Sequence, residues 1–285
     1  MNKNEKKLKK DKKMNLDLEV RLLDSTTPFA IREAFNHLRT NLMYTLNDEE
    51  GCPVFAVTSA GESAGKSTLM ANVAISYAMA SKKVLLIDAD MRAPMQYRIF
   101  SKDKEIRGLS ELLSGIETDD TNLIVSSGTP GVELLLAGLT PPNPSELIMS
   151  NRFEQYLKKW RMSYDAIFID FPPVGIVTDT LAVHHLVTGY IFVIRSDRSD
   201  GRTVAAALDT MKKVDAKILG IVLNDINPKH YGNYSYRKSG YGKYSKYSRY
   251  SKKHEGAKYE SSYENAYERA HAKQQAAAKE NHNNT

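Results

Sequence analysis

The stretch that decides the fold covers residues 54–68 and reads Val-Phe-Ala-Val-Thr-Ser-Ala-Gly-Glu-Ser-Ala-Gly-Lys-Ser-Thr. It opens with a short apolar run, which is typical of a strand that is buried on both faces of a sheet. A turn rich in Gly and Ser follows, and an Ala-rich helical pattern begins at Thr68. This order of strand, turn and helix is the context in which a phosphate-binding P-loop forms.

The turn departs from the strict P-loop pattern only at Ala60, where glycine is usual. We expect Gly61 and Gly65 to let the backbone fold around phosphate oxygens, and the helix N-terminus to attract their negative charge. Lys66 should then reach the β- and γ-phosphates of ATP, and the Ser67 hydroxyl should ligate Mg²⁺. The predicted nucleotide-binding residues are Gly61, Glu62, Ser63, Ala64, Gly65, Lys66, Ser67 and Thr68.

Two further apolar runs end in carboxylates. Asp88 and Asp90 follow the run at 84–87, and Asp170 follows the run at 166–169. Ligands of open parallel sheets bind at the carboxyl ends of strands, so these three carboxylates should converge on the P-loop and its metal. The P-loop and the two acidic strand ends therefore support one another as parts of a single nucleotide site.

The rest of the chain alternates between strand and helix patterns. Further strands are expected at 84–87, 133–136, 166–169, 190–194 and 218–223, and helices at 27–44, 68–80, 145–160 and 203–214. This alternation predicts right-handed βαβ units, and hence a mainly parallel sheet with helices on both faces. The expected fold class is a P-loop NTPase-like α/β domain that spans residues 17–226.

The net charge of +6 is unevenly spread along the 285 residues. Residues 1–16 carry +5 and residues 227–285 carry +7, which leaves −6 for residues 17–226. Both ends are poor in apolar side chains, so we expect a disordered basic N-terminal tail and a flexible C-terminal tail. A nucleic-acid reader would show basic charge on its folded surface, so no nucleic-acid partner is expected.

The C-terminal tail is rich in tyrosine. Ten of the sixteen tyrosines lie between residues 231 and 267, among Gly, Ser, Lys and Arg. A flexible chain of this length has an r.m.s. span of roughly 40 Å, whereas a domain of this size has a radius of gyration of roughly 17 Å. The tail of one subunit could therefore reach the site of another. The tail tyrosines are Tyr231, Tyr234, Tyr236, Tyr241, Tyr244, Tyr247, Tyr250, Tyr259, Tyr263 and Tyr267.

Cellular location follows from what the chain lacks. No apolar run approaches the eighteen or so residues that would span a bilayer, and the Lys-rich N-terminus is not followed by the apolar segment of a secretory signal. Cys52 is the only cysteine, so no internal disulfide can form. We expect a cytoplasmic protein.

These motifs together resemble those of the bacterial tyrosine kinases of capsule and exopolysaccharide synthesis. The resemblance covers roughly residues 20–226. The residues that carry it are the P-loop, the run Asp88-Ala89-Asp90-Met91-Arg92, the run Ile169-Asp170-Phe171-Pro172-Pro173, the stretches at 108–115, 141–147 and 220–224, and the C-terminal tyrosines.

The resemblance implies roles for individual residues. Lys66 matches the P-loop lysine, while Ser67, Asp90 and Asp170 would hold Mg²⁺. Asp88 would accept the proton of the attacking tyrosine, since a hydroxyl with a pKa near 10 is mostly protonated at neutral pH. The ten tail tyrosines would be the phosphoacceptors. The family also implies an ATP-dependent kinase that phosphorylates its own tail in trans and regulates polysaccharide synthesis and export.

Family members of the Gram-positive type imply several partners. These are a separate membrane-protein activator, which also regulates polysaccharide chain length, a cognate tyrosine phosphatase, and further copies of the chain. The activator would place the protein at the inner face of the cell membrane. The family helix that helps subunits form a ring often reads Glu-x-x-Arg-x-x-Arg. Here it has Glu33, Asn36 and Arg39, so ring assembly through this helix lacks its middle arginine.

Two other readings keep the nucleotide site and predict no phosphotyrosine. One is a partitioning-type P-loop ATPase whose tail is an interaction segment. That class carries a second lysine early in the P-loop, where this chain has Gly61. The other is a non-catalytic regulator of polysaccharide export that binds nucleotide as a structural ligand.

Overall fold

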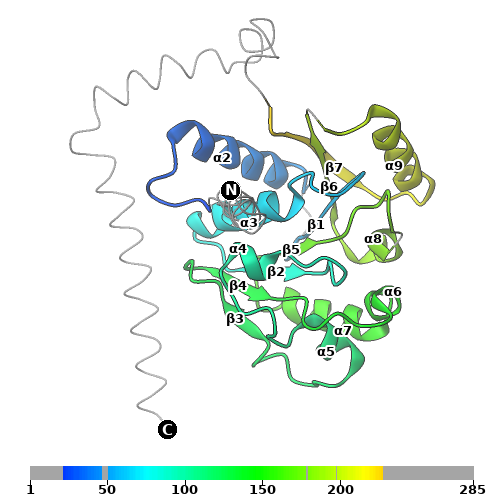
Figure 1. The fold of residues 1–285 in the computed structure, drawn as a ribbon. Coiled ribbons are helices and arrows are strands. Elements are labelled where there is room, and N and C mark those ends of the chain that lie inside the picture. Colours follow the sequence, from blue (N-terminus) through cyan, green and yellow to red (C-terminus); the bar gives the residue numbers. More distant parts are fainter. Residues whose placement is uncertain (1–21, 47–50, 178, 197, 227–285) are drawn as a thin grey trace, which may run out of the picture.

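The structure is a computed structural model and describes residues 22–46, 51–177, 179–196 and 198–226, which Figure 1 draws in colour. The predictions for the two tails, and with them all ten predicted phosphoacceptors, lie outside the described residues. No helix in the described part of the chain is long and apolar enough to cross a membrane.

A seven-stranded sheet forms the centre of the domain, with the strand order β3-β4-β2-β5-β1-β6-β7. Strand β3 runs antiparallel to β4, and every other neighbouring pair is parallel. The predicted mainly parallel α/β fold is therefore confirmed. The strands are β1 (Val54–Ser59), β2 (Val84–Asp88), β3 (Ile124–Ser126), β4 (Val132–Leu135), β5 (Ala166–Asp170), β6 (Gly189–Arg195) and β7 (Ile218–Asn224).

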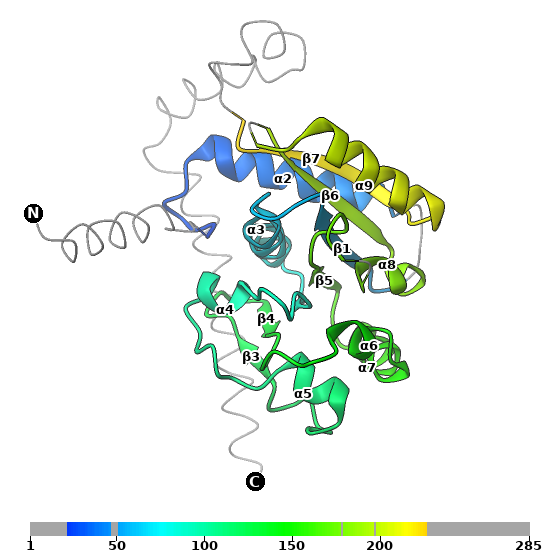
Figure 2. The same cartoon turned by 45° about the vertical axis from the view of Figure 1, so that its right-hand side comes forward.

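Helices cover both faces of this sheet (Figures 1 and 2). On one face lie α2 (Phe29–Tyr44), α3 (Lys66–Met79) and α4 (Gln96–Ile99). The other face carries α5 (Leu109–Ser114), α6 (Pro144–Ile148), α7 (Asn151–Arg161), α8 (Asp179–Ala182), the short 3₁₀ helix η1 (His184–Leu186) and α9 (Gly201–Lys213).

The two cores form because successive side chains of a strand point to opposite faces. In β1, Val54 and Ala56 join the core under α5–α9, while Phe55 and Val57 join the core under α3. Since all six residues of β1 are buried, its first four residues form an unbroken apolar run, and the polar Thr58 and Ser59 follow only at its carboxyl end.

Helix α3, which begins with the last residues of the P-loop, is mostly buried. Ten of its 14 residues are buried, because the helix lies between the sheet and α2. Helices that are apolar on all sides are usually buried in this way. The result is a rigid support for the residues at its N-terminus, which begin directly after the P-loop turn.

Two predicted features need correction, and some short elements were not predicted. The helix expected at 145–160 is two helices, α6 and α7. The break falls at Ser150, whose backbone is extended and whose hydroxyl donates to the Leu147 carbonyl. Strand β7 is an edge strand and is only partly buried, so it is not covered on both faces as the other apolar runs are. Short elements such as β3 and α4 have too few residues to show a period, and the sequence did not predict them.

Candidate nucleotide site

The three predicted motifs meet at one edge of the sheet. Strand β5 lies between β1 and β2, and all three run parallel, so their carboxyl ends are neighbours. Asp88 at the end of β2 is paired in register with Asp170 at the end of β5. The P-loop leaves the end of β1 beside them. The topology thus brings together residues that are far apart in the sequence, such as Lys66 and Asp170.

The P-loop turn takes its shape from two left-handed residues. Ser63 has a φ of 57° and Gly65 has a φ of 92°. A side chain at Gly65 would also collide with the Asn224 amide, so only glycine fits there. Gly61 has no positive φ and no protein atom within 4 Å of the place where a side chain would begin, so the fold of the turn does not itself require glycine there. The prediction that Gly61 makes room for phosphate oxygens stays a prediction.

Side chains from the far strands hold this turn in place. The Arg195 guanidinium donates to the Ser63 carbonyl at 3.0 Å and pairs with the Asp225 carboxylate at 2.7 Å. The Asn224 amide donates to the Ala64 carbonyl at 3.0 Å. The ends of β6 and β7 therefore fix the backbone of the P-loop, a role that the sequence pattern alone did not indicate.

The P-loop residues Lys66, Ser67 and Thr68 form the first turn of α3. Lys66 is only 7% exposed, and its charge acts on the buried Asp170 carboxylate. The Ser67 hydroxyl hydrogen-bonds to the same carboxylate. Thr68 is half-buried and its carbonyl accepts a hydrogen bond from Asn72. The loop residue Glu62 is exposed.

Asp88 is held by backbone N–H groups. Its Oδ2 accepts from Met95 at 3.1 Å and from Gln96 at 2.9 Å, and its Oδ1 accepts from Asp90 at 3.2 Å. Asp90 in turn accepts from the Ala93 N–H through Oδ1 at 3.0 Å. These contacts fix the direction of both carboxylates before any ligand binds.

Burial controls the charge state of the two paired carboxylates. It raises the pKa of Asp88 well above the usual range, and the nearby charges of Asp170 and Asp90 raise it further. Burial also raises the pKa of Asp170, against the opposing effects of the Lys66 ammonium and the hydrogen bonds from Ser67 and Gln96. Asp88 is therefore a stronger base than an exposed carboxylate.

Sequence reasoning missed two contributors to this edge. Gln96 donates from its amide to Asp170 Oδ2 at 2.9 Å and to the Ser67 carbonyl at 3.1 Å. Arg92 donates to Asp179 Oδ2 at 3.0 Å and to the Ser145 hydroxyl at 3.0 Å. Arg92 lay inside a noted motif, but its partners come from distant segments, and no local pattern marks Gln96.

The donor set suits a hard divalent cation such as Mg²⁺. The Ser67, Asp90 and Asp170 side chains offer oxygen atoms, and Asp170 Oδ1 is buried with no hydrogen-bond partner in the structure. No three His, Cys, Asp or Glu side chains in the described part of the chain form a metal cage of their own. Mg²⁺ fits such a site, because it commonly keeps several waters and takes further oxygens from substrate phosphates.

The helix that corresponds to the ring-forming helix of the family, but lacks its middle arginine, makes contacts within the chain. The Asn36 amide donates to Glu33 at 2.9 Å, and the Arg39 guanidinium donates to the Ser76 carbonyl and hydroxyl on α3. Arg39 therefore ties α2 to α3 in the folded subunit.

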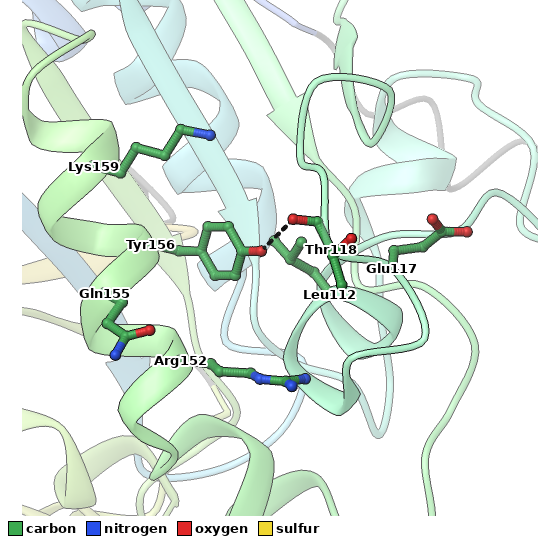
Figure 3. A pocket seen from close by; sticks show the side chains of 7 residues that line it. All are labelled: Leu112, Glu117, Thr118, Arg152, Gln155, Tyr156 and Lys159. Atoms are coloured by element: carbon green, nitrogen blue, oxygen red, sulfur yellow. Dashed lines mark hydrogen bonds between the residues drawn. The ribbon is translucent and has the colours of Figure 1, made fainter.

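A separate cavity of about 320 Å³ lies between α5 and α7. Figure 3 shows Arg152 and Tyr156 pointing from α7 toward α5, with the Tyr156 hydroxyl donating to the Thr118 carbonyl at 2.9 Å. None of its lining residues belongs to the three motifs. They are Leu112, Glu117, Thr118, Arg152, Gln155, Tyr156 and Lys159.

A mainly parallel sheet with a P-loop after β1 and acidic residues at the ends of β5 and β2 defines a P-loop nucleotide-binding protein. The comparisons agree with this class, since the CobQ/CobB/MinD/ParA nucleotide-binding domain matches residues 55–238.

Among P-loop nucleotide-binding proteins, the chain is most informatively compared with several curated relatives. The chain is 36% identical to the putative tyrosine-protein kinase CapB of Staphylococcus aureus, over 72% of this chain and 89% of the relative. It is 33% identical to the tyrosine-protein kinase CpsD of Streptococcus agalactiae, over 72% of this chain and 90% of the relative. The solved BceF tyrosine kinase domain is 32% identical, with a TM-score of 0.66, over 76% of this chain and 88% of that one. The chain belongs to this family of bacterial tyrosine kinases.

Proposed function

We propose that the chain is an ATP-dependent protein-tyrosine kinase that acts in capsular or exopolysaccharide synthesis and phosphorylates tyrosines of its own C-terminal tail. The observation that carries the chemistry is the meeting of Lys66, Asp88 and Asp170 at one buried sheet edge. The likeness to tyrosine-protein kinases supports tyrosine as the phosphate acceptor. It favours the kinase over a partitioning-type ATPase or a non-catalytic regulator.

The nucleotide would lie over the P-loop. Backbone N–H groups of the turn and the N-terminus of α3 would receive the phosphates, and Lys66 would offset the charge of the β- and γ-oxygens. Ser67, Asp90 and Asp170 would hold Mg²⁺, directly or through its waters. The cation, when bound, neutralises the negative charge that develops on the phosphate oxygens.

The chemical step exchanges one phosphorus–oxygen bond for another. The tyrosine oxygen forms a bond to the γ-phosphorus, the bond between that phosphorus and the bridging oxygen breaks, and ADP leaves. The phenolic proton passes to Asp88, whose raised pKa makes it an adequate acceptor for a weakly acidic hydroxyl. Asp88 Oδ2 accepts two backbone N–H groups and Oδ1 accepts only that of Asp90, so Oδ1 keeps the capacity to accept the proton.

The tail changes its charge as it reacts. Each phosphate adds about −1.5 to −2 charges at neutral pH, and the tail begins at +7. Four or five phosphotyrosines would therefore neutralise it, on this basis. A basic tail that binds an acidic neighbour or anionic lipid would be released by phosphorylation, and a cognate phosphatase would restore it.

A separate membrane-protein activator would complete the system and keep the kinase at the inner face of the cell membrane. Its role would be to raise the activity of the enzyme, so the kinase alone would be nearly silent. Copies of the chain would have to approach one another, because each tail would be phosphorylated in the site of another subunit.

The first test is incubation of the purified chain with ATP and Mg²⁺, with and without a candidate activator, followed by mass spectrometry of the tail. Phosphotyrosine at residues 231–267 is the expected result. Bound nucleotide without any phosphotyrosine in either condition would refute the kinase proposal and restore the two alternatives.

Transfer between subunits needs a second test. The variant Lys66→Met keeps the tail but should lose activity, whereas a chain that ends at residue 226 keeps the site and lacks the tail. We expect a mixture of the two to contain phosphotyrosine on the Lys66→Met chain. A tail that reacts only when it belongs to the active chain would show that transfer occurs in cis.

A further inference from the structure

Two buried oxygen atoms at the candidate site have no hydrogen-bond partner in the structure. They are Gln96 Oε1 and Asp170 Oδ1, on residues that are 1% and 0% exposed. Buried polar atoms of this kind are uncommon, since each forfeits the hydrogen bond that water would give it. Both atoms are acceptors, so the group that satisfies them must be a hydrogen-bond donor or a cation.

Gln96 touches all three motifs of the site. Its Nε2 donates to the Ser67 carbonyl at 3.1 Å and to Asp170 Oδ2 at 2.9 Å. Its backbone N–H donates to Asp88 Oδ2 at 2.9 Å. One residue therefore connects the P-loop helix with both acidic strand ends.

These contacts also fix which way the amide faces. Its two partners, a carbonyl and a carboxylate, can only accept, so the NH₂ group must face them. Both N–H bonds are then used within the chain, and Oε1 is left with unused acceptor capacity. Gln96 holds Asp170 through Oδ2 in the same way, which leaves Asp170 Oδ1 unused.

We propose that Gln96 is a positioning residue for the Mg²⁺ of the bound nucleotide. It holds Asp170 so that Oδ1 stays available, and its own Oε1 supplies a second acceptor for hydrogen atoms of the Mg²⁺ water shell. Water on a cation donates hydrogen, whereas a phosphate oxygen only accepts and cannot satisfy either atom. The inference rests on nucleotide binding at this site, and it does not require tyrosine to be the acceptor.

The test compares ADP binding with and without the cation. Gln96→Met keeps the length of the side chain and removes the amide, so Asp170 loses its positioning contact. In excess EDTA, ADP affinity should stay within about twofold of the wild type, because Lys66 and the backbone N–H groups that would receive the phosphates are unchanged, and only the hydrogen bond to the Ser67 carbonyl is lost. With Mg²⁺, affinity should fall by about 10–100-fold, the range found when a residue that orients a metal ligand is removed.

Two further variants make the measurement decisive. Gln155→Met makes the same chemical change on α7, away from the three motifs, and should bind ADP as the wild type does in both buffers. Gln96→Asn keeps an amide that is one methylene too short to bridge Ser67 and Asp170, and it should lose part of the Mg²⁺ effect. It serves as the test if Gln96→Met does not fold, which its thermal unfolding curve will show.

Titration calorimetry gives a readout that is independent of kinase activity. An equal loss of ADP affinity in EDTA and in Mg²⁺ would mean that Gln96 only supports the P-loop, and it would overturn the proposal. So would a Mg²⁺ effect of wild-type size in both Gln96 variants. A wild-type chain that binds Mg²⁺ and ADP together yet phosphorylates no tyrosine would refute the kinase assignment alone.

Discussion

Two groups of buried carboxylates in this molecule differ in how their oxygens are used. Asp120 is 3% exposed, and its oxygens accept from Lys159 at 2.6 Å and from the Trp160 indole at 2.7 Å. Glu111 is 4% exposed, and both of its oxygens also accept hydrogen bonds, including one from the Gly108 N–H at 2.8 Å. Every oxygen of these two carboxylates therefore has a hydrogen-bond partner within the fold.

At the sheet edge, both oxygens of Asp88 also accept hydrogen bonds, but those of Asp170 do not. Asp170 has one oxygen without a partner, and Asp88 and Asp170 lie side by side, so burial and mutual repulsion act on their charges. A protein gains nothing in stability from such a pair while the site is empty. Burial alone therefore does not separate a carboxylate that serves a ligand from one that serves the fold; an oxygen without a partner marks Asp170, and the mutual repulsion of two buried carboxylates marks Asp88.

The largest expected effect separates the two groups by activity. Asp88→Asn should lower the rate of tyrosine phosphorylation on the order of 10³-fold, because it removes the proposed proton acceptor. Asp120→Asn should keep a rate close to that of the wild type. Phosphotyrosine formed per minute at saturating ATP and Mg²⁺ measures both. Comparable losses in the two variants would break the distinction.

The second prediction is that a carboxylate outside the site, Asp120, matters for stability and not for the reaction rate. Asp120→Ala should lower the free energy of unfolding by about 1–3 kcal/mol, because the buried Trp160 N–H loses its acceptor. In a domain of this size, each kcal/mol shifts the melting temperature by about 2–4 °C. Thermal unfolding measures the change. Asp119→Ala, an exposed neighbour in the same turn, is the matched control and should have little effect.

The third prediction concerns a carboxylate that belongs to both regions. Asp179 contacts Arg92 of the second motif, yet its oxygens are used, one by Arg92 and the other by the Ser145 hydroxyl at 2.6 Å. We expect Asp179→Asn to cost about 1 kcal/mol of stability and to change the kinase rate by less than about tenfold. A loss of kinase rate as large as that of Asp88→Asn would show that nearness to the site matters more than whether the carboxylate oxygens already have partners.

The smallest expected effect is a pH dependence. The folded-state pKa of Asp88 is raised above its unfolded value near 3.8. Its contribution to stability is therefore fully present below that value and is lost as the pH rises through the raised pKa. Without nucleotide or metal, the stability of Asp88→Asn relative to the wild type should be greater at neutral pH than as the pH approaches 3.8. Thermal unfolding in EDTA across this interval measures it, and a constant or opposite difference would contradict the raised pKa.

The strands and the central site could be read from sequence because their signals are local. The apolar runs, the P-loop turn and the carboxylates at the strand ends each lie within a few consecutive residues, and parallel pairing brings such ends together. The left-handed turn at Gly65 was predictable for the same reason.

The features that the sequence did not predict depend mostly on contacts between distant segments. Gln96 acquires its partners only when α4 packs beside the P-loop helix, and the clamp by Arg195 and Asn224 needs β6 and β7 in place. The break at Ser150 depends on one side-chain hydrogen bond within a continuous helical pattern. None of these leaves a periodic trace along the chain.

The sequence by itself determined the nucleotide-binding class of this protein, the sheet edge at which the three motifs meet, and the tyrosine-rich, basic composition of the tail. Those properties follow from short-range patterns and from composition. Only the tertiary structure decided which carboxylates are completed by neighbours and which are left with an unused oxygen. That distinction depends on hydrogen bonds and burial, which exist only once segments such as β2, β5 and α4 have packed together.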